Sequence, residues 1–325
     1  MNRTEFFRQM GVNLDLALEA HEMLRGQAQR EIPGVREEKE SFPGGEVTTI
    51  TILDTIGERM MGRAQGTYIT IEAPELRVNN RLAHKEISNL MGQKLNQLMQ
   101  KWNIGPDRLV LLVGLGNWQA TPDALGPRVI DQCLVTRHLY QYAPEELVGG
   151  LRPVSAIAPG VLGITGIETA EIIRGVAERL KPQAIIAVDA LAAQNLDRIS
   201  TTIQMADTGI APGSGVGNQR AEISHRAMGI PVIAIGVPTV VHAAVIVFEA
   251  MEQLRQKTPQ MAMQLQPNLM QETAGQVLAP FGGQLTVTPK EIDDLINNTA
   301  RVLAAGINQG LHPAVEPDTF ATYLQ

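Results

Sequence analysis

Two aspartates that follow short apolar runs are the side chains of this sequence best placed to do chemistry. The run LVLLV leads through GLGNWQATP to Asp123, and the run AIIAV ends directly on Asp189. Both runs are short, β-branched and apolar on every position, which predicts buried parallel strands. In open α/β sheets, ligands bind outside the carboxyl ends of such strands. If the two strands are neighbours, we expect both carboxyl groups to face one crevice.

Two carboxyl groups in one crevice favour acid–base hydrolysis. Because close like charges do not both ionise easily, one of Asp123 and Asp189 would hold a proton near neutral pH. One carboxylate could then activate a water while the protonated partner donates to the reacting group. The same pair also suits a divalent metal, with His242 or His138 as a further ligand. A bland alternative for Asp123 is that it caps the helix that follows it.

The glycine-rich turns do not match nucleotide-binding motifs. GLGN follows a predicted strand, but Gln119 stands where the dinucleotide fingerprint needs its third glycine. PGSGVGNQR lacks the Lys-Ser/Thr of a phosphate loop, so its Gly213, Ser214 and Gly215 predict either a tight turn or a backbone wall for an extended peptide or a carboxylate. There is no G-x-S-x-G nucleophile motif, and the lone Cys133 lies in an apolar stretch typical of a core. We therefore expect no cofactor.

Composition narrows the class of protein. The 325 residues are 44% hydrophobic and 19% charged, and the net charge of -7 leaves no basic footprint for nucleic acid. A single cysteine cannot form an internal disulfide, which fits a reducing cytoplasm. The sequence has neither a signal peptide pattern nor an apolar run long enough to cross a membrane. We expect a cytoplasmic protein that binds neither nucleic acid nor membranes.

Alternating strands and helices predict an α/β fold with a mostly parallel central sheet covered on both faces. The predicted strands of this core span 108–113, 154–159, 184–189 and 231–238, and its helices span 124–141, 168–180 and 239–257. The flanking predictions are a helix at 16–30, a loop at 31–45, strands at 47–53 and 66–73, a helix at 80–102, an edge strand at 200–206, a mobile segment at 258–280 and a closing helix capped by Thr288. We expect one domain at 16–325, with additions at 16–105, a core at 106–257 and a C-terminal segment at 258–325.

Several long strings together resemble the germination protease family of spore-forming bacteria. They are GLGNWQATPDALGPRVIDQCLVTRHL, RPVSAIAPGVLGITGIETAEII, AIIAVDALAA, DTGIAPGSGVGN, GIPVIAIGVPTVV and LAPFGGQLTVTPKEID. The resemblance implies an endopeptidase that begins the degradation of small acid-soluble spore proteins during germination, in the cytoplasm of the forespore or spore core. It also implies a homotetramer, a self-processing zymogen, and a three-layer α/β/α sandwich like that of hydrogenase maturation proteases.

The resemblance carries site residues as well. The catalytic aspartates of the TPDALGP and DALAA motifs correspond to Asp123 and Asp189. The family's processing junction precedes an L-A-x-E-A string, which here spans 16–20, so the implied cut lies between Asp15 and Leu16 and releases residues 1–15.

Substrates of the family also offer an acidic residue before the cut. A basic side chain should read that carboxylate, and the candidates are Arg128, Arg137 and Arg152.

Two other functions stay open at this point. Hydrogenase maturation proteases bind nickel, so a metallopeptidase with Asp123, Asp189 and His242 as ligands is the alternative mechanism. A binding or assembly module is the other, with the aspartates as helix caps and no turnover of spore proteins.

Overall fold

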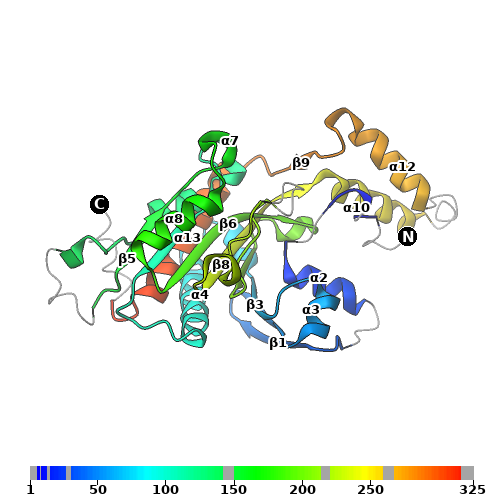
Figure 1. The fold of residues 1–325 in the computed structure, drawn as a ribbon. Helices are drawn as coiled ribbons and strands as arrows, with labels where there is room; N and C mark the ends of the chain where they lie inside the picture. The colour runs from blue at the N-terminus through cyan, green and yellow to red at the C-terminus, as the bar shows by residue number, and fades with distance from the viewer. Residues whose placement is uncertain are drawn as a thin grey trace.

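Nine strands of the described residues form one mixed sheet at the centre of the computed structural model (Figure 1). The structure describes residues 6–7, 9–12, 15–26, 31–141, 150–213, 220–258 and 267–315. The strand order is β1-β2-β3-β7-β8-β6-β4-β5, and β9 pairs with β8. In chain order the strands are β1 (Val35–Phe42), β2 (Gly45–Ile52), β3 (Gly66–Glu72), β4 (Val110–Gly114), β5 (Val154–Ile157), β6 (Ala184–Ala193), β7 (Thr202–Ala206), β8 (Val232–His242) and β9 (Thr286–Val287).

The sheet has an antiparallel half and a parallel half. Strands β1, β2, β3 and β7 pair antiparallel with one another, and β7 pairs antiparallel with β8. Strands β8, β6, β4 and β5 pair in parallel. The expectation of a mostly parallel sheet was therefore wrong, because the strands from the N-terminal additions join the same sheet through the β3–β7 pair.

Two segments account for this difference. Residues 31–45 were expected to be a loop, yet they contain β1, whose sequence VREEKESF is largely exposed and polar, as is typical of edge strands, where charged side chains discourage pairing with another chain. Strand β7 was expected at an edge, but it lies between β3 and β8 and is buried along its whole length.

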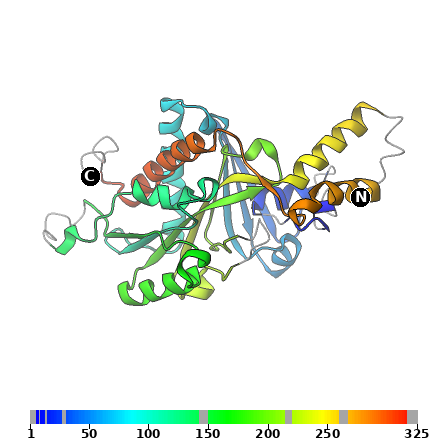
Figure 2. The ribbon, with the colours of Figure 1, turned by 90° about the horizontal axis from the view of Figure 1, so that it is seen from above.

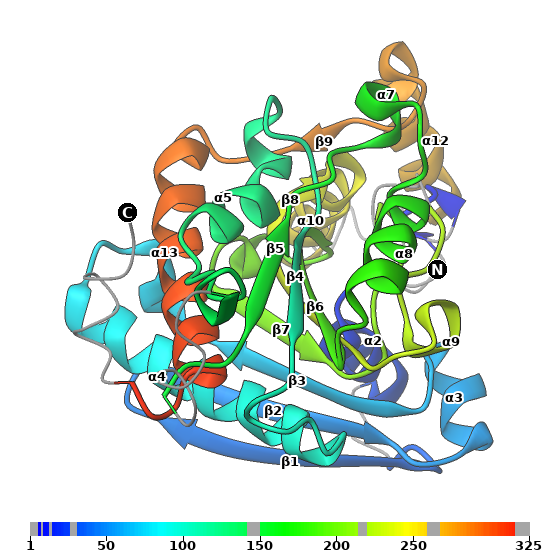
Figure 3. The same cartoon turned by 60° about the vertical axis from the view of Figure 1, so that its left-hand side comes forward.

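Helices cover both faces of the sheet (Figure 3). On one face, α4 (Arg81–Lys101), α5 (Leu125–Asp131) and α13 (Ile292–Leu311) enclose the largest apolar cluster, which includes the buried Cys133 as predicted. On the other face lie α2 (Ala17–Arg25), α3 (Thr55–Met61) and α8 (Thr169–Leu180). The remaining helical segments are η1 (Pro74–Arg77), η2 (Thr121–Asp123), η3 (Leu139–Gln141), α7 (Leu162–Thr165), η4 (Leu196–Arg198), α9 (His225–Met228), α10 (Ala243–Lys257), α12 (Pro267–Leu278) and η6 (Ala279–Phe281).

Tertiary hydrogen bonds make one helix end earlier, and another begin later, than the sequence predicts. The helix expected over 124–141 stops at Asp131, because the backbone N–H of Leu134 donates to Asn308 Oδ1 and that of Thr136 donates to the Val154 carbonyl. The closing helix begins at Ile292 rather than after Thr288, whose hydroxyl donates to the Thr239 carbonyl instead.

Helices α10 and α12 form an arm that extends from the body of the molecule (Figure 2). Within the segment expected to be mobile, 267–278 form α12, which packs on α10 around Phe248. Phe6 and Phe7 from the N-terminal segment complete this apolar cluster, with the rings of Phe6 and Phe248 centred 5.0 Å apart. The arm is thus ordered by contacts from a segment far away in the sequence.

No helix among the described residues combines the length and the apolar character that crossing a lipid bilayer requires.

Candidate active site

Asp189 lies on β6, and Asp123 lies in η2, which follows the neighbouring strand β4; the two strands are neighbours as expected. Strand β4 pairs in parallel with β6, and its last residue, Gly114, stands opposite Val188. Asp189 follows at once on β6. The strand does not end there, however, because β6 continues to Ala193 along β8 after β4 has left the sheet.

The GLGN turn packs closely against the backbone of Asp123 and so fixes its position near β6. Gly116 has a φ of +114°, and a Cβ at this position would lie 2.0 Å from the backbone oxygen of Asp123. The N–H of Asn117 donates to that same oxygen at 3.0 Å. Only glycine tolerates both the backbone angle and the close approach, so this turn positions Asp123 rather than a nucleotide.

Burial raises the pKa of both carboxyl groups. Burial raises the pKa of Asp123 to about 6, against a hydrogen bond from the backbone of Asn117 that lowers it. Asp189 is only 5% exposed. Burial raises its pKa well above the usual range, the charge of Asp123 raises it further, and the N–H of Ala190, 2.9 Å from Asp189 Oδ1, acts in the opposite sense. Near neutral pH the two carboxyl groups therefore present one acid and one base.

Both aspartates line an open cavity of about 790 Å³. Its walls come from β6, β7 and β8, from the loop that follows β7 and includes Gly213, and from the region of β9. The predicted wall residues Ser214 and Gly215 lie outside the described residues, so their role stays a prediction.

The implied processing junction lies in this same cavity. Asp15 lines it, and Leu16 is fully buried beside it. The N–H of Ala192 donates to Asp15 Oδ2 at 2.9 Å, and the charge of Asp15 raises the pKa of Asp189. The side chain of Gln204, on β7, also contacts the junction; no sequence motif had pointed to it.

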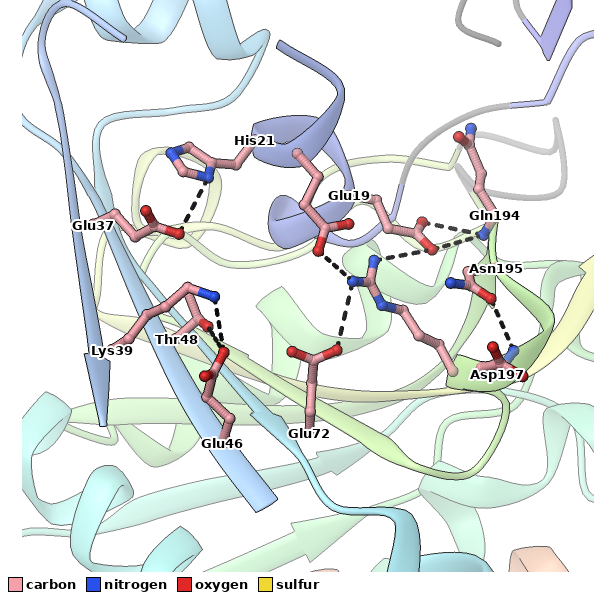
Figure 4. A network of polar contacts seen from close by, with 12 residues as sticks. Glu19, His21, Glu37, Lys39, Glu46, Thr48, Glu72, Gln194, Asn195 and Asp197 are labelled. Carbon is pink, nitrogen blue, oxygen red and sulfur yellow. Dashed lines mark hydrogen bonds and ion pairs between the residues drawn. The ribbon is translucent and has the colours of Figure 1, made fainter. Parts of the chain in front are cut away.

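Backbone N–H groups at the end of β6 bind two carboxylates of the N-terminal segment, those of Asp15 and Glu19. Beyond the end of β4, the N–H of Ala192 reaches Asp15 and the N–H of Gln194 reaches both carboxylate oxygens of Glu19, at 3.0 and 3.1 Å. Figure 4 shows the Glu19–Gln194 contact. The buried Arg198 adds ion pairs of 3.4 Å to Glu19, 2.7 Å to Glu22 and 3.5 Å to Glu72.

These contacts hold α2 against the sheet immediately after the junction.

The three arginines predicted to read an acidic substrate residue do not line the cavity. Arg128 binds Asn297, and Arg152 is buried with its guanidinium donating to the carbonyls of Gly105 and Leu311. Arg137 is exposed elsewhere on the surface. Their positions lend no support to that role.

Arg63 and Arg220 are the arginines of the described residues that do line the cavity. Burial lowers the pKa of Arg63, while the charges of Tyr68 and Asp15 favour its protonated form. Arg63 is therefore within electrostatic reach of the Asp15 carboxylate. Its sequence context, between α3 and β3, had offered no sign of this.

The predicted metal ligands are not assembled. His242 is 5% exposed and caps α10, where its Nδ1 accepts the N–H of Ala244 at 3.1 Å, and it is not among the cavity residues. His138 is exposed. Across the described ranges, no three His, Cys, Asp or Glu side chains lie together in a way that could hold a metal ion. The metallopeptidase alternative therefore finds no ligand set here.

Comparison with known proteins defines the class to which this fold and site belong. The family model described as germination protease matches residues 15–258 and 251–324. The germination protease of Caldanaerobacter subterraneus subsp. tengcongensis is 47% identical over 320 residues, covering 94% of this chain and 96% of that protein. Those of Clostridium tetani (42% identical; 97% and 100% covered) and Bacillus subtilis (38%; 96% and 96%) are also similar.

These matches define the class of the chain as a protease, a hydrolase of peptide bonds. The chain belongs to the germination protease family.

Proposed function

We propose that this chain is an aspartic-type endopeptidase that begins the degradation of small acid-soluble spore proteins during spore germination. The observation that carries the proposal is the pair Asp123 and Asp189, which share one cavity and both have a raised pKa. The name germination protease, borne by relatives that span nearly the whole chain, supports the setting.

The proposed chemistry uses one water and no further reactant. The ionised carboxylate of the pair takes a proton from water as its oxygen attacks the scissile carbonyl carbon. The carbonyl electron pair moves onto oxygen and forms a tetrahedral intermediate. When it collapses, the C–N bond breaks and the protonated carboxyl delivers its proton to the leaving amine. Because the pair titrates as a unit, either aspartate can take either part.

The proposal includes a zymogen that removes its own residues 1–15. It is supported by the position of Asp15 in the cavity and by a family match that begins at residue 15. Phe6 and Phe7 pack on the arm of α10 and α12, so cleavage after Asp15 would separate them covalently from the body.

Arg63 is our candidate for reading the acidic residue before the cut. It lines the cavity, and its charge interacts with that of Asp15. The N–H of Ala192 supplies a second contact to the same carboxylate. Charge-assisted hydrogen bonds of this kind favour an acidic residue over its amide.

The homotetramer, the location in the forespore or spore core, and a three-layer fold related to hydrogenase maturation proteases belong to the same proposal, and they rest on the family resemblance.

Intact-mass analysis of the full chain tests the catalytic pair. The wild type should lose residues 1–15, whereas Asp123→Asn and Asp189→Asn should keep them. Asp131→Asn is the matched control, because it is an exposed aspartate at the end of α5, close to Asp123 in sequence. Trimming in either active-site variant contradicts the proposal. Cleavage of an acid-soluble spore protein by the trimmed wild type, and by neither variant, tests the substrate class.

A further inference from the structure

The side chain of Gln204 bridges the peptide bond that the proposed processing would break. Its Nε2 donates to the carbonyl oxygen of Asp15 at 3.1 Å, and its Oε1 accepts the N–H of Ala17 at 2.5 Å. The carbonyl of Asp15 is the scissile carbonyl of the Asp15–Leu16 bond. One buried amide, 9% exposed, therefore contacts the chain on both sides of the cut.

The sheet register places Gln204 in the same row as Asp189. Gln204 on β7 is opposite Gly236 on β8, which is in turn opposite Asp189 on β6. Directly opposed residues point to the same face of a sheet, and two strand spacings separate these Cα atoms by about 10 Å. The intervening residue is Gly236, and the side chain of Leu191 packs over it, so Leu191 forms the floor between Gln204 and Asp189. The junction contacts Gln204 directly, and the carboxylate of Asp15 lies within electrostatic reach of Asp189.

We propose that Gln204 is a catalytic residue that orients the scissile peptide and stabilises the oxyanion formed on it. This inference rests on the proposed function. When water adds to the carbonyl carbon of Asp15, the carbonyl electron pair moves to the oxygen that already accepts from Gln204 Nε2. A hydrogen-bond donor fixed beside developing negative charge lowers the barrier more than it stabilises the uncharged carbonyl. The electron pair returns as the C–N bond breaks, and Gln204 exchanges no proton.

The two contacts of Gln204 can be separated by experiment. The Oε1 contact has a structural use, since α2 begins at Ala17 and its N-cap, Leu16, offers no side-chain cap. The Nε2 contact does not cap the helix, because Asp15 precedes it. A role as a helix cap therefore needs only the acceptor, whereas oxyanion stabilisation needs the donor.

Two substitutions distinguish these roles in the full-length chain. Gln204→Glu keeps an acceptor but, once ionised, removes the donor; Gln204→Met removes both. We expect self-processing near neutral pH to slow by about a hundredfold to a thousandfold in both variants, the usual cost of losing one oxyanion donor. Gln93→Glu, an exposed change of the same type on α4, should process at the wild-type rate.

The pH profile supplies a readout that a structural role would not produce. On acidification the introduced carboxyl gains a proton and becomes a donor. The self-processing rate of Gln204→Glu, divided by that of the wild type, should therefore rise as the pH falls. The same ratio for Gln204→Met should stay low and should not change with pH. The ratio is the proper measure because the ionisable groups around the site, namely Asp15, Arg63, Tyr68, Asp123, Asp189, Arg220 and Glu222, are common to all the proteins compared. Melting temperatures of the variants report any loss of folding separately.

The outcomes are distinct. Gln204→Glu that processes at the wild-type rate at neutral pH, or Gln204→Met that does so at any pH, overturns the inference. A flat ratio for Gln204→Glu also overturns it, leaving Gln204 as a helix cap. Absence of trimming in the wild type would instead refute the proposed self-processing itself, and trimming that survives Asp189→Asn would refute the proposed catalytic pair.

Discussion

In the proposed mechanism, the parallel half of the sheet supplies the acid and base, and the antiparallel half supplies the contacts that hold the peptide. Asp189 lies within β6, and Asp123 follows the neighbouring strand β4; the two strands are joined by buried parallel pairing. Gln204 comes from β7, and Arg63 from the connection into β3. The chemistry therefore depends on rigid strand ends, whereas recognition depends on whether the N-terminal strands and α2 dock correctly onto them.

The largest effect on the function proposed for the parallel half should come from a substitution in the turn that positions Asp123. Gly116→Val should abolish self-processing, a loss of more than about a thousandfold, because a side chain there collides with the backbone of Asp123 and a misplacement of about 1 Å already costs on the order of a hundredfold. The measurement is the initial rate of loss of residues 1–15 by mass spectrometry.

The control for this change is Gly175→Ala in α8, where a Cβ meets nothing within 4 Å. Alanine should leave processing intact and add up to about 1 kcal/mol of stability. Wild-type processing by Gly116→Val would show that the turn does not position the site.

In the antiparallel half, we expect the largest loss of stability from a substitution of Arg198. Arg198→Met removes the ion pair between Arg198 and the buried Glu19, and removing one partner of a buried pair costs about 3–5 kcal/mol. Urea unfolding measures the loss in the free energy of unfolding. Arg36→Met, which breaks an exposed pair with Glu38, should change it by less than about 1 kcal/mol. If the two substitutions had equal effects, Arg198 would not contribute to holding α2 against the sheet.

A substitution of Arg63 tests whether recognition of the acidic residue can be separated from the chemical step. Replacing Arg63 with Met should reduce the preference for an acidic residue over its amide before the cut by about tenfold to a hundredfold, the range expected for one charge-assisted hydrogen bond. Rates on paired peptides that copy the junction, with Asp or Asn at the position of Asp15, measure this preference. Arg59→Met, at an exposed residue of α3, is the control. An unchanged preference would transfer the role to the N–H of Ala192 or to Arg220.

The smallest effect expected is a dependence of stability on pH. The folded pKa of Asp123, about 6, exceeds its unfolded value near 3.8, so folding favours the protonated form. The folded state thus binds more protons than the unfolded state between these values, and the stability that Asp123 contributes at low pH is lost as the pH rises through this window. As the pH rises from 4 to 7, the free energy of unfolding of Asp123→Asn should therefore increase relative to that of the wild type by about 1 kcal/mol. This figure is reduced to allow for solvent screening.

Urea unfolding at several pH values measures this difference, with Asp131→Asn beside it. A difference between wild type and Asp123→Asn that is constant with pH would mean that Asp123 is not buried as described.

Sequence patterns predicted the parallel half well and the antiparallel half poorly. The apolar runs before Asp123 and Asp189 identified strands that are indeed neighbours, because a strand buried on both faces must be apolar throughout. Strand β1 was mistaken for a loop, because its charged residues belong to an edge, and β7 was mistaken for an edge although it is interior.

The specificity arginines illustrate the same difficulty. Arg128 and Arg152 lie close in sequence to the catalytic motifs, yet their side chains point into contacts with α13 and with backbone carbonyls. Arg63, sixty residues before Asp123 in the chain, reaches the cavity because β3 docks beside β7. Distance along the chain does not predict distance across a sheet whose strands are joined by crossovers.

By itself, the sequence determined the alternation of strands and helices, the two aspartates associated with neighbouring buried strands, and the family to which the chain belongs. These properties are local, since they depend on the period and polarity of short segments. Only the tertiary structure decided that the Asp15–Leu16 junction lies in the cavity with the two aspartates and that Gln204 bridges it. Those contacts join residues more than 170 positions apart, and they exist because folding places β7 two strands from β6.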